Sequence, residues 1–256
     1  MLERSAVGYR SPLLAGLGVP HAFTTRPLDV GPLDGPLSEH LRRAAGVKLD
    51  TPILAPRQVH GGEVLRVDAG MDRLAVGDAP ADGVWTEGPG ALLLIRTADC
   101  VPVLLASADG ARVAAVHAGW RGLVAGVLPA AVAALAGAGS GALAAAIGPC
   151  LSPARFEVGP EVADAFRAAD LGAAVHERPG SRPHVDLAAA ASLQLERGGV
   201  ARIDRAGLCT WEGAAEFWSY RRDVTHGALP RTGRLAALIA AAPDDSPVSR
   251  REGPNG

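Results

Sequence analysis

The sequence has few of the residues that cross-link chains or bind metals in bulk. Of its 256 residues, three are cysteines and seven are histidines. A small, odd cysteine count argues against a disulfide framework and is typical of a reducing compartment, so we expect a cytoplasmic protein. The same count excludes a zinc site built from four cysteines.

An excess of charge of one sign is also missing. There are 25 basic and 27 acidic residues, which gives a formal net charge of -2. Such a balance provides no broad basic field for nucleic acid or an anionic membrane, so we expect neither partner. The N-terminal segment has no basic part followed by an apolar run, and no signal peptide is expected.

One long stretch lacks charge altogether. No Asp, Glu, Lys or Arg occurs at residues 122–154, a length that would suit a membrane span. Pro129 interrupts the stretch, however, and Gly137, Gly139 and Gly141 interrupt it again. The pattern therefore predicts a buried helix, a turn and a buried strand rather than a membrane span.

Strand-like and helical segments are interspersed along the chain without a regular alternation. Apolar, β-compatible runs occupy residues 91–97, 101–106, 111–117 and 143–147. Helices are expected at residues 38–45, 121–136, 161–169, 186–198 and 233–242, with Ser38, Asp186 and Thr232 as N-caps. We expect an α/β (α+β) fold, a single domain at residues 1–241 with mixed β-sheets and helices packed outside. Residues 242–256 are expected to form a flexible tail.

A predicted hairpin brings a cysteine close to a histidine. Asp109-Gly110 is a strong signal for a two-residue turn. With that turn, cross-strand partners have numbers that sum to 219, so His117 faces Pro102. Cys100 is then the diagonal neighbour of His117 on the same face, near enough to share a metal ion. A three-residue turn would reverse this parity, and each residue alone is more often structural.

The segment after this strand favours anion binding. Residues 117–122 (HAGWRG) run from the strand end into a helix start, where free N–H groups attract anions. Arg121 adds a positive charge at that point, although it could instead be a solvated residue of the first helical turn.

A metal site needs a third ligand, and spacing alone does not choose it. His60 precedes two glycines that would let a ligand approach closely, whereas His40 and His176 lie in charged surroundings and are expected to be exposed. Spacing does not separate His60 from His184. One cysteine and two histidines would leave zinc an open fourth position, as in catalytic sites.

Three motifs resemble those of the bacterial YfiH-like family, which has been described as polyphenol oxidase, laccase-like, peptidoglycan editing factor and purine nucleoside phosphorylase. They are RQVHG at residues 57–61, TADCVP at residues 97–102 and VHAGWRG at residues 116–122. Further matches extend the resemblance over about residues 21–238. They lie at residues 147–149, 156–159, 186–187, 209–210, 219–223 and 232–234.

The resemblance implies a layered fold and a catalytic zinc held by His60, Cys100 and His117, with copper as an adventitious or alternative metal. It implies phosphorolysis of adenosine, inosine, guanosine or methylthioadenosine, and deamination of adenosine. Zinc lowers the pKa of water, which would provide the nucleophile for attack on the purine C6. The loops at residues 27–36 and 224–231 depart from the family pattern, so the resemblance carries no substrate contact over from them.

Four further residues are expected to bind substrate. The resemblance places Arg26 near the substrate phosphate, and Arg121 is the second candidate for that role. Gln58 and Asp99 complete the set. Asp99 could orient a ligand or move a proton, or could be a strand-end carboxylate without a chemical role.

Two other enzyme classes fit part of the pattern. With Cys100 as nucleophile and His117 as base, the chain would be a cysteine hydrolase or amidase, which suits a role in editing peptidoglycan precursors. A copper-dependent polyphenol oxidase fits less well. Four copper ions would need about ten histidines, mostly in His-x-His pairs, and this chain has seven and no such pair.

Overall fold

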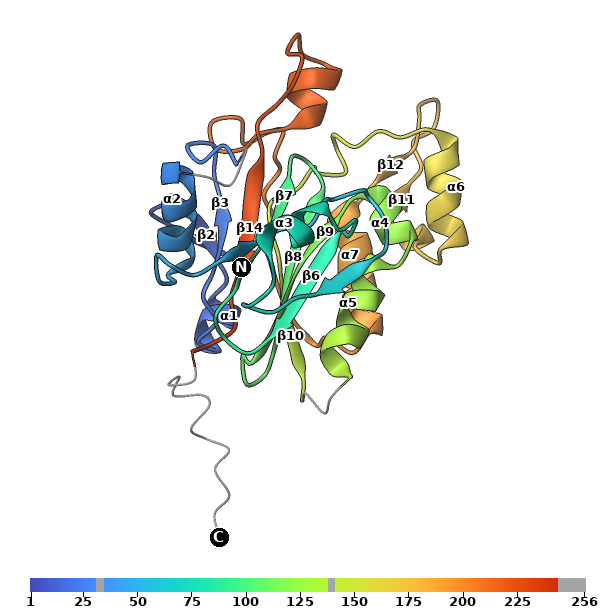
Figure 1. Ribbon diagram of the computed structural model, residues 1–256. Helices are drawn as coiled ribbons and strands as arrows, with labels where there is room; N and C mark the ends of the chain where they lie inside the picture. Colours follow the sequence, from blue (N-terminus) through green and yellow to red (C-terminus); the bar gives the residue numbers. More distant parts are fainter. Residues whose placement is uncertain (31–34, 138–140, 244–256) are drawn as a thin grey trace.

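The apolar runs of the sequence form two six-stranded sheets that pack face to face, with helices on their outer faces (Figure 1). The computed structural model describes residues 1–30, 35–137 and 141–243. The layers follow the order helix, sheet, sheet, helix, which confirms the expected single domain of mixed sheets with helices outside.

The first sheet is antiparallel except at one edge. Its strands lie in the order β1 (Glu3–Ser5), β2 (Gly8–Arg10), β3 (His21–Thr24), β14 (Leu235–Ile239), β7 (Leu92–Thr97) and β4 (Ile53–Leu54). Only β4 and β7 are parallel neighbours. Helix α2 (Gly35–Ala45) covers the outer face through Leu41 and Ala44, and two short helices, α1 (Pro12–Gly16) and α3 (Arg73–Asp78), lie in the connections.

The second sheet carries most of the helices. Its strands lie in the order β13 (Arg202–Arg205), β10 (Leu143–Ile147), β8 (Val101–Ser107), β9 (Arg112–Ala118), β6 (Gly83–Glu87) and β5 (Val64–Arg66), with parallel pairs at both edges. The helices on this side are α4 (Trp120–Val124), α5 (Val127–Ala136), α6 (Pro160–Ala168) and α7 (Leu187–Arg197). A small ribbon, β11 (Val175–His176) with β12 (His184–Val185), stands apart from both sheets.

The central strands are apolar on both faces because each face meets a different layer. On β8, Val103 and Leu105 pack against the helices, while Leu104 and Ala106 pack against the first sheet. Side chains of a strand alternate between faces, so this division follows directly from the sequence order. Strands buried on both sides read as continuous apolar runs.

The predicted hairpin register is present. Pro102 pairs with His117 and Ala106 pairs with Val113 between β8 and β9. The predicted two-residue turn is wrong, because residues 108–111 connect the strands and the N–H of Gly110 donates to the carbonyl of Ser107 at 2.9 Å. Gly110 takes a left-handed φ of 73°, and the Asp109 carboxylate accepts a hydrogen bond from the N–H of Ala111 at 3.0 Å.

The predicted helix at residues 233–242 is wrong, because Leu235–Ile239 is the strand β14, between β3 and β7. All five residues are buried, because both faces of the strand are covered, so the sequence does not alternate between apolar and polar residues. Its Ala- and Leu-rich composition favours a helix locally, and pairing with two neighbouring strands overrides that preference. Thr232 does not cap a helix, and its hydroxyl donates to Asp223 at 2.7 Å.

Two other helix predictions need correction. The single helix expected at residues 121–136 is two helices, and the break lies at Gly126, whose φ is 80°. Pro129 falls in the first turn of α5, where a missing N–H costs no intrahelical hydrogen bond. Helix α2 begins before Ser38, so Ser38 is not its N-cap, and the Ser38 hydroxyl accepts from Arg42 at 3.0 Å.

The predicted helix at residues 186–198 and the buried elements predicted for the uncharged stretch are confirmed. Asp186 caps α7 by accepting from the N–H of Ala189 at 2.9 Å. The uncharged stretch contains most of α4, all of α5 and the strand β10. In the part of the chain that the structure describes, no helix combines the length and apolarity needed to cross a membrane. Ala242 is buried, and the rest of the predicted tail from residue 244 lies outside the described residues.

We expect Leu238→Ala to lower the free energy of unfolding by about 2–5 kcal/mol, because the substitution leaves a cavity in a central strand. Leu74→Ala is the matched control, since Leu74 is 77% exposed on α3 and should change stability by less than about 0.5 kcal/mol. Urea denaturation followed by circular dichroism measures both. Equal, small effects would contradict the placement of Leu238 in the core.

Candidate functional site

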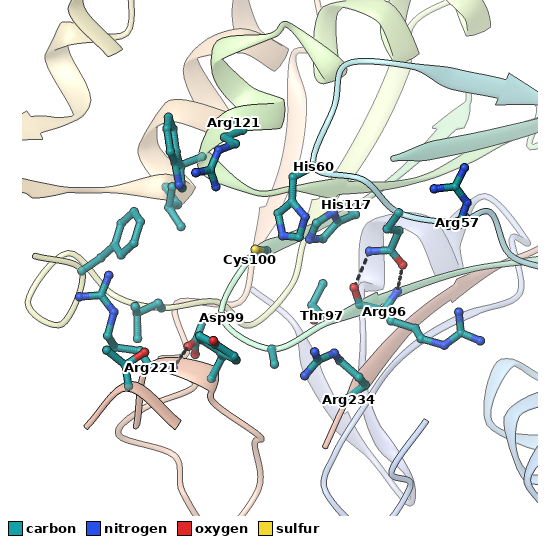
Figure 2. Close-up of a pocket in the computed structure, with 18 of the residues that line it drawn as sticks. Arg57, His60, Arg96, Thr97, Asp99, Cys100, His117, Arg121, Arg221 and Arg234 are labelled. Carbon is teal, nitrogen blue, oxygen red and sulfur yellow. Dashed lines mark hydrogen bonds between the residues drawn. The ribbon is translucent and has the colours of Figure 1, made fainter. Parts of the chain in front are cut away.

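One end of the second sheet brings together three side chains from distant parts of the chain. Cys100 directly precedes β8, and His117 is the penultimate residue of β9. His60 comes from the loop between β4 and β5. Their sulfur and ring nitrogen atoms all lie within 4.8 Å of one another (Figure 2).

His60 reaches this group because its loop is held in an unusual conformation. The φ of His60 is 61°, a left-handed value that costs a residue with a Cβ atom about 1–2 kcal/mol. The buried carboxylate of Asp82 offsets that cost by accepting three backbone N–H bonds, from Val59 at 3.1 Å, His60 at 2.9 Å and Gly61 at 2.6 Å. Strained residues held this way are typical of functional sites.

The same carboxylate orients His117. Asp82 Oδ1 lies 2.7 Å from His117 Nδ1, and both side chains are buried. With Nδ1–H donating to Asp82, Nε2 of His117 is the nitrogen left for Cys100 or a metal. A carboxylate behind a histidine ligand fixes its tautomer and ring orientation in metal sites. Asp82 thus positions two of the three side chains at once.

Gly119 leaves room for the three side chains to meet. A Cβ atom at this position would lie 3.1 Å from Cys100 Sγ and 3.1 Å from His60 Cδ2. At these distances the neighbouring side chains would have to move by a few tenths of an ångström. Close packing of the three side chains, rather than its own backbone angles, therefore favours glycine after the strand end.

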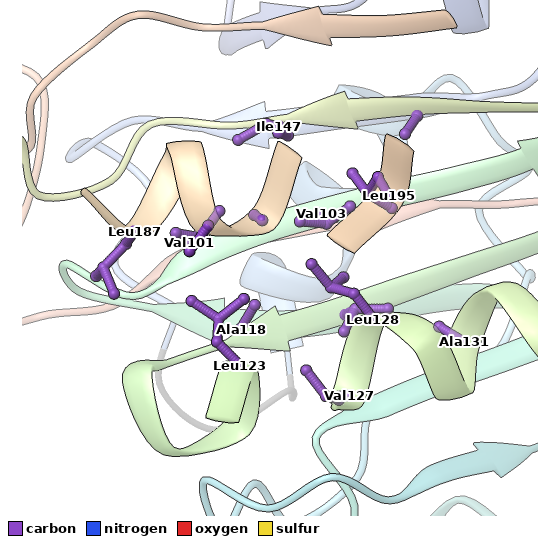
Figure 3. Close-up of a cluster of buried hydrophobic side chains, with 14 of the residues drawn as sticks. Val101, Val103, Ala118, Leu123, Val127, Leu128, Ala131, Ile147, Leu187 and Leu195 are labelled. Carbon is purple, nitrogen blue, oxygen red and sulfur yellow. The ribbon is translucent and has the colours of Figure 1, made fainter. Parts of the chain in front are cut away.

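The strand ends beneath the group are anchored in the larger core. Val101, Ala118 and Leu123 are fully buried and pack with Leu187 of α7 (Figure 3). Val101 directly follows Cys100, and Ala118 directly follows His117. The positions of both side chains are consequently set by a packed core and not by a surface loop.

Cys100 and His117 stabilise each other's charged form. Burial alone would raise the pKa of the Cys100 thiol, but the charge of His117 and hydrogen bonds from both imidazoles lower it to about 6. Burial alone would lower the pKa of His117, but the Cys100 thiolate and Asp82 raise it to about 9. A thiolate is the form of cysteine that binds metals or acts as a nucleophile.

The donor set fits a metal ion with three protein ligands. One sulfur and two imidazole nitrogens, from the buried His117, the half-buried Cys100 and the exposed His60, suit zinc or a similar soft divalent ion in a tetrahedral arrangement, with one position left for substrate. Among the described residues, this is the one group of three or more His, Cys, Asp or Glu side chains placed to hold a metal.

The group lies in the wall of a cavity of about 1700 Å³. Among the described residues that line it, seven are arginines and three carry carboxylates. The arginines are Arg57, Arg73, Arg96, Arg121, Arg182, Arg221 and Arg234, and the carboxylates are Asp99, Glu157 and Glu161. This excess of positive charge suits an anionic ligand.

Three of the four residues expected to bind substrate line this cavity. Arg121 is exposed at the start of α4, with its guanidinium 4.3 Å from the ring centre of Trp120. Gln58 donates to the carbonyl of Arg96 at 2.7 Å and accepts from its N–H at 2.8 Å, which ties the His60 loop to β7. Asp99, with a φ of 89°, accepts from the Thr210 hydroxyl and the N–H of Arg221, each at 2.6 Å.

The fourth, Arg26, is not among the described residues that line the cavity. Its guanidinium donates to the carbonyl of Ala214 at 2.6 Å and lies over the Trp218 ring at 3.9 Å. His184, the sequence alternative to His60, is buried elsewhere and bonds to the carbonyl of Pro153. A contact of Arg26 with phosphate therefore stays a prediction.

Sequence reasoning missed Asp82 and most of the cavity arginines. Asp82 lies in a segment with turn composition, and nothing in its spacing connects it to His117, which is 35 residues away. The arginines Arg57, Arg96 and Arg234 come from separate segments. Arg57 and Arg234 lie within the matched motifs at residues 57–61 and 232–234, but only the folded chain shows that they line one cavity with Arg96 and that Asp82 contacts His117.

Comparison with known proteins places the chain. The family described as "Multi-copper polyphenol oxidoreductase laccase" matches residues 38–242. The chain belongs to this family. A Deinococcus radiodurans relative, named purine nucleoside phosphorylase, is 38% identical over 258 residues, which cover 94% of this chain and 93% of the relative. The Escherichia coli relative, named purine nucleoside phosphorylase YfiH, is 39% identical and covers 71% of each chain.

Solved structures of the family share the fold. YlmD from Geobacillus stearothermophilus superposes with a TM-score of 0.77 at 26% identity, over 94% of this chain and 98% of that one. A Neisseria meningitidis protein gives 0.68 at 31% identity, over 87% and 91%. These matches confirm the predicted resemblance to YfiH-like proteins and the layered fold.

We expect Asp82→Asn to weaken metal binding by about 10- to 100-fold, the usual cost of removing a group that orients a metal ligand. Each Asp82 oxygen accepts two hydrogen bonds, and an amide would turn one of them into an NH₂ group facing two donors. Titration against a competing chelator measures the change. Asp78→Asn is the control, because Asp78 is an exposed carboxylate in α3. Unchanged affinity in Asp82→Asn would contradict this role.

Proposed function

We propose that the chain is a zinc-dependent purine nucleoside phosphorylase that also deaminates adenosine. The single observation that carries the proposal is a three-ligand metal group in the wall of an arginine-lined cavity. Relatives named purine nucleoside phosphorylase, at 38–45% identity, support the same class of reaction. The substrates are then a purine nucleoside and inorganic phosphate.

The state of the arginines supports phosphate binding. Nine arginines form ion pairs with described carboxylates, and none of the nine lines the cavity. In contrast, five cavity arginines form no ion pair with a described carboxylate. These are Arg57, Arg121, Arg182, Arg221 and Arg234. Positive charge left unneutralised around one cavity is the condition for holding an anion.

Phosphorolysis asks mainly for positioning and charge neutralisation. A phosphate oxygen attacks C1′ of the ribose while the bond from C1′ to the purine nitrogen breaks, and the purine leaves with the electron pair. Arg121 is the cation that we assign to the phosphate, because it lines the cavity beside the metal group whereas Arg26 does not. Gln58 and Asp99 hold the surrounding loops in place through their hydrogen bonds to Arg96 and Arg221.

The metal group supports the deaminase activity in the same cavity. Zinc held by His60, Cys100 and His117 would supply a Lewis acid for attack at the purine C6. The residues of the chain hold the thiolate and orient the imidazoles, and the open face of the group meets the cavity. The family description names several coppers, but one group of this kind is present among the described residues, which favours a single-metal enzyme.

We expect zinc-loaded protein to release purine base and ribose 1-phosphate from inosine or adenosine only when phosphate is present, and to form inosine from adenosine. His117→Ala should lower both activities on the order of 100-fold or more, because it removes a ligand. Chromatography of the products measures both. His176→Ala, an exposed histidine of β11, is the control. No product above the His117→Ala level would refute the proposal.

A second candidate function rests on the lowered pKa of Cys100. A thiolate beside a protonated His117 is also the arrangement of cysteine hydrolases, so an amidase acting on peptidoglycan precursors remains the alternative. Metal content separates the two, because a thiolate that binds zinc is not free to attack.

We expect about one zinc ion per chain in the wild type, copper far below four per chain, and loss of zinc in Cys100→Ala. Cys209→Ala should keep its zinc, because Cys209 is a half-buried cysteine outside the group. Elemental analysis of the purified proteins measures all three. Wild-type protein without stoichiometric metal, with Cys100 open to alkylation, would favour the amidase.

A further inference from the structure

The cavity has two chemically different ends on either side of the metal group. Arginines line the first end, which we call the arginine end. It is formed by Arg57 after β4, Arg73 of α3, Arg96 of β7 and Arg234 before β14. In Figure 2, Arg57 and Arg96 lie to the right of the histidines and Arg234 lies below them. No described carboxylate from these four segments lines the cavity.

The second end has mixed charge. Glu157 and Glu161 line it together with Arg121, Arg182 and Arg221. Arg221 is partly used within the protein, since it donates to the carbonyl of Glu157 at 2.9 Å. Acidic and basic side chains next to one another can accept hydrogen bonds from a nucleoside and donate hydrogen bonds to it. The co-substrate phosphate would bind Arg121 at this end.

The guanidinium of Arg234 is not neutralised by any carboxylate among the described residues. Its side chain reaches only the carbonyls of Thr232 and Gly233, at 3.4 and 3.2 Å, and it forms no ion pair with a described carboxylate. Its backbone N–H donates to Asp29 at 2.8 Å, which fixes the residue at the start of β14. Burial and the nearby charge of Arg234 lower the pKa of Arg96. An anion bound beside Arg234 would be stabilised by the positive charges of both residues.

The size of the cavity also exceeds the needs of the reaction proposed above. Its volume of about 1700 Å³ is larger than the range of about 300–1,000 Å³ that is usual for small-molecule sites. A phosphate at Arg121 and a nucleoside beside the metal group leave the arginine end without a ligand. Unused space therefore lies at the same end as Arg57 and Arg234, which form no ion pair with a described carboxylate.

We propose that the arginine end is a second anion site, which binds the 5′-phosphate of a purine nucleoside monophosphate. The ribose would then lie between this end and the co-substrate phosphate at Arg121. This inference rests on the proposed function for the orientation of the nucleoside. It adds a class of ligand, phosphorylated purine nucleosides, that the phosphorylase reaction does not itself require.

Calorimetric titration of the zinc-loaded full chain, without free phosphate, tests the site by binding alone. Inosine 5′-monophosphate should bind at least about tenfold more tightly than inosine, the gain expected from charge-assisted hydrogen bonds. Arg234→Gln should remove about tenfold of the monophosphate affinity and change inosine affinity by less than about twofold. Arg231→Gln, an exposed arginine outside the cavity, is the matched control and should leave both unchanged.

Equal binding of inosine and its monophosphate would overturn the proposal. A second result would also overturn it: Arg234→Gln weakens the binding of orthophosphate, and inosine 5′-monophosphate binds no more tightly than inosine. The arginine end would then bind the co-substrate phosphate. Failure of the proposed function would give a different result. The protein would then perform no phosphorolysis but would still bind inosine 5′-monophosphate more tightly than inosine.

Discussion

The carboxylate of Asp82 accepts four hydrogen bonds from two segments that are distant in sequence, the loop at residues 59–61 and the strand that ends after His117. Without those bonds, nothing would offset the cost of the left-handed backbone at His60, and the ring of His117 would be free to rotate. The pKa of Asp82 is held below its usual range because these donors outweigh the effect of burial. The buried Asp82 carboxylate thus holds His60 and His117, from two separate segments, in one site.

The layered architecture decides where such a site can form. The central strands β7, β8, β9 and β14 are apolar on both faces, so no polar chemistry fits along their length. Polar side chains can appear only where these strands end. The cavity lies at that edge, where β7 ends at Thr97, β8 starts after Cys100 and β14 starts after Arg234. Burial of the strands therefore supplies both the rigidity of the site and its position.

Local sequence signals predicted the parts of the fold that depend on local chemistry. Asp109-Gly110 predicted the hairpin register that pairs His117 with Pro102, although the turn itself is longer than two residues, and Asp186 marked the start of α7. The strand β14 was predicted as a helix because five buried residues show no alternation, and only its neighbours make it a strand. His60 was chosen over His184 by family resemblance. Asp82 could not be predicted, because its partners are defined by the folded chain.

Burial divides the charges of the site into two kinds. Cys100 and His117 lie at the buried side and compensate each other, so their charges need no ligand to persist. Arg57, Arg121 and Arg234 are exposed and are solvated by water instead. Water can be exchanged for a phosphate at little cost, whereas an internal ion pair cannot be given up without leaving a buried charge. A substrate should therefore present its anionic groups to the exposed rim and its neutral purine to the interior, which is the orientation that a nucleoside reacting at both C1′ and C6 would need.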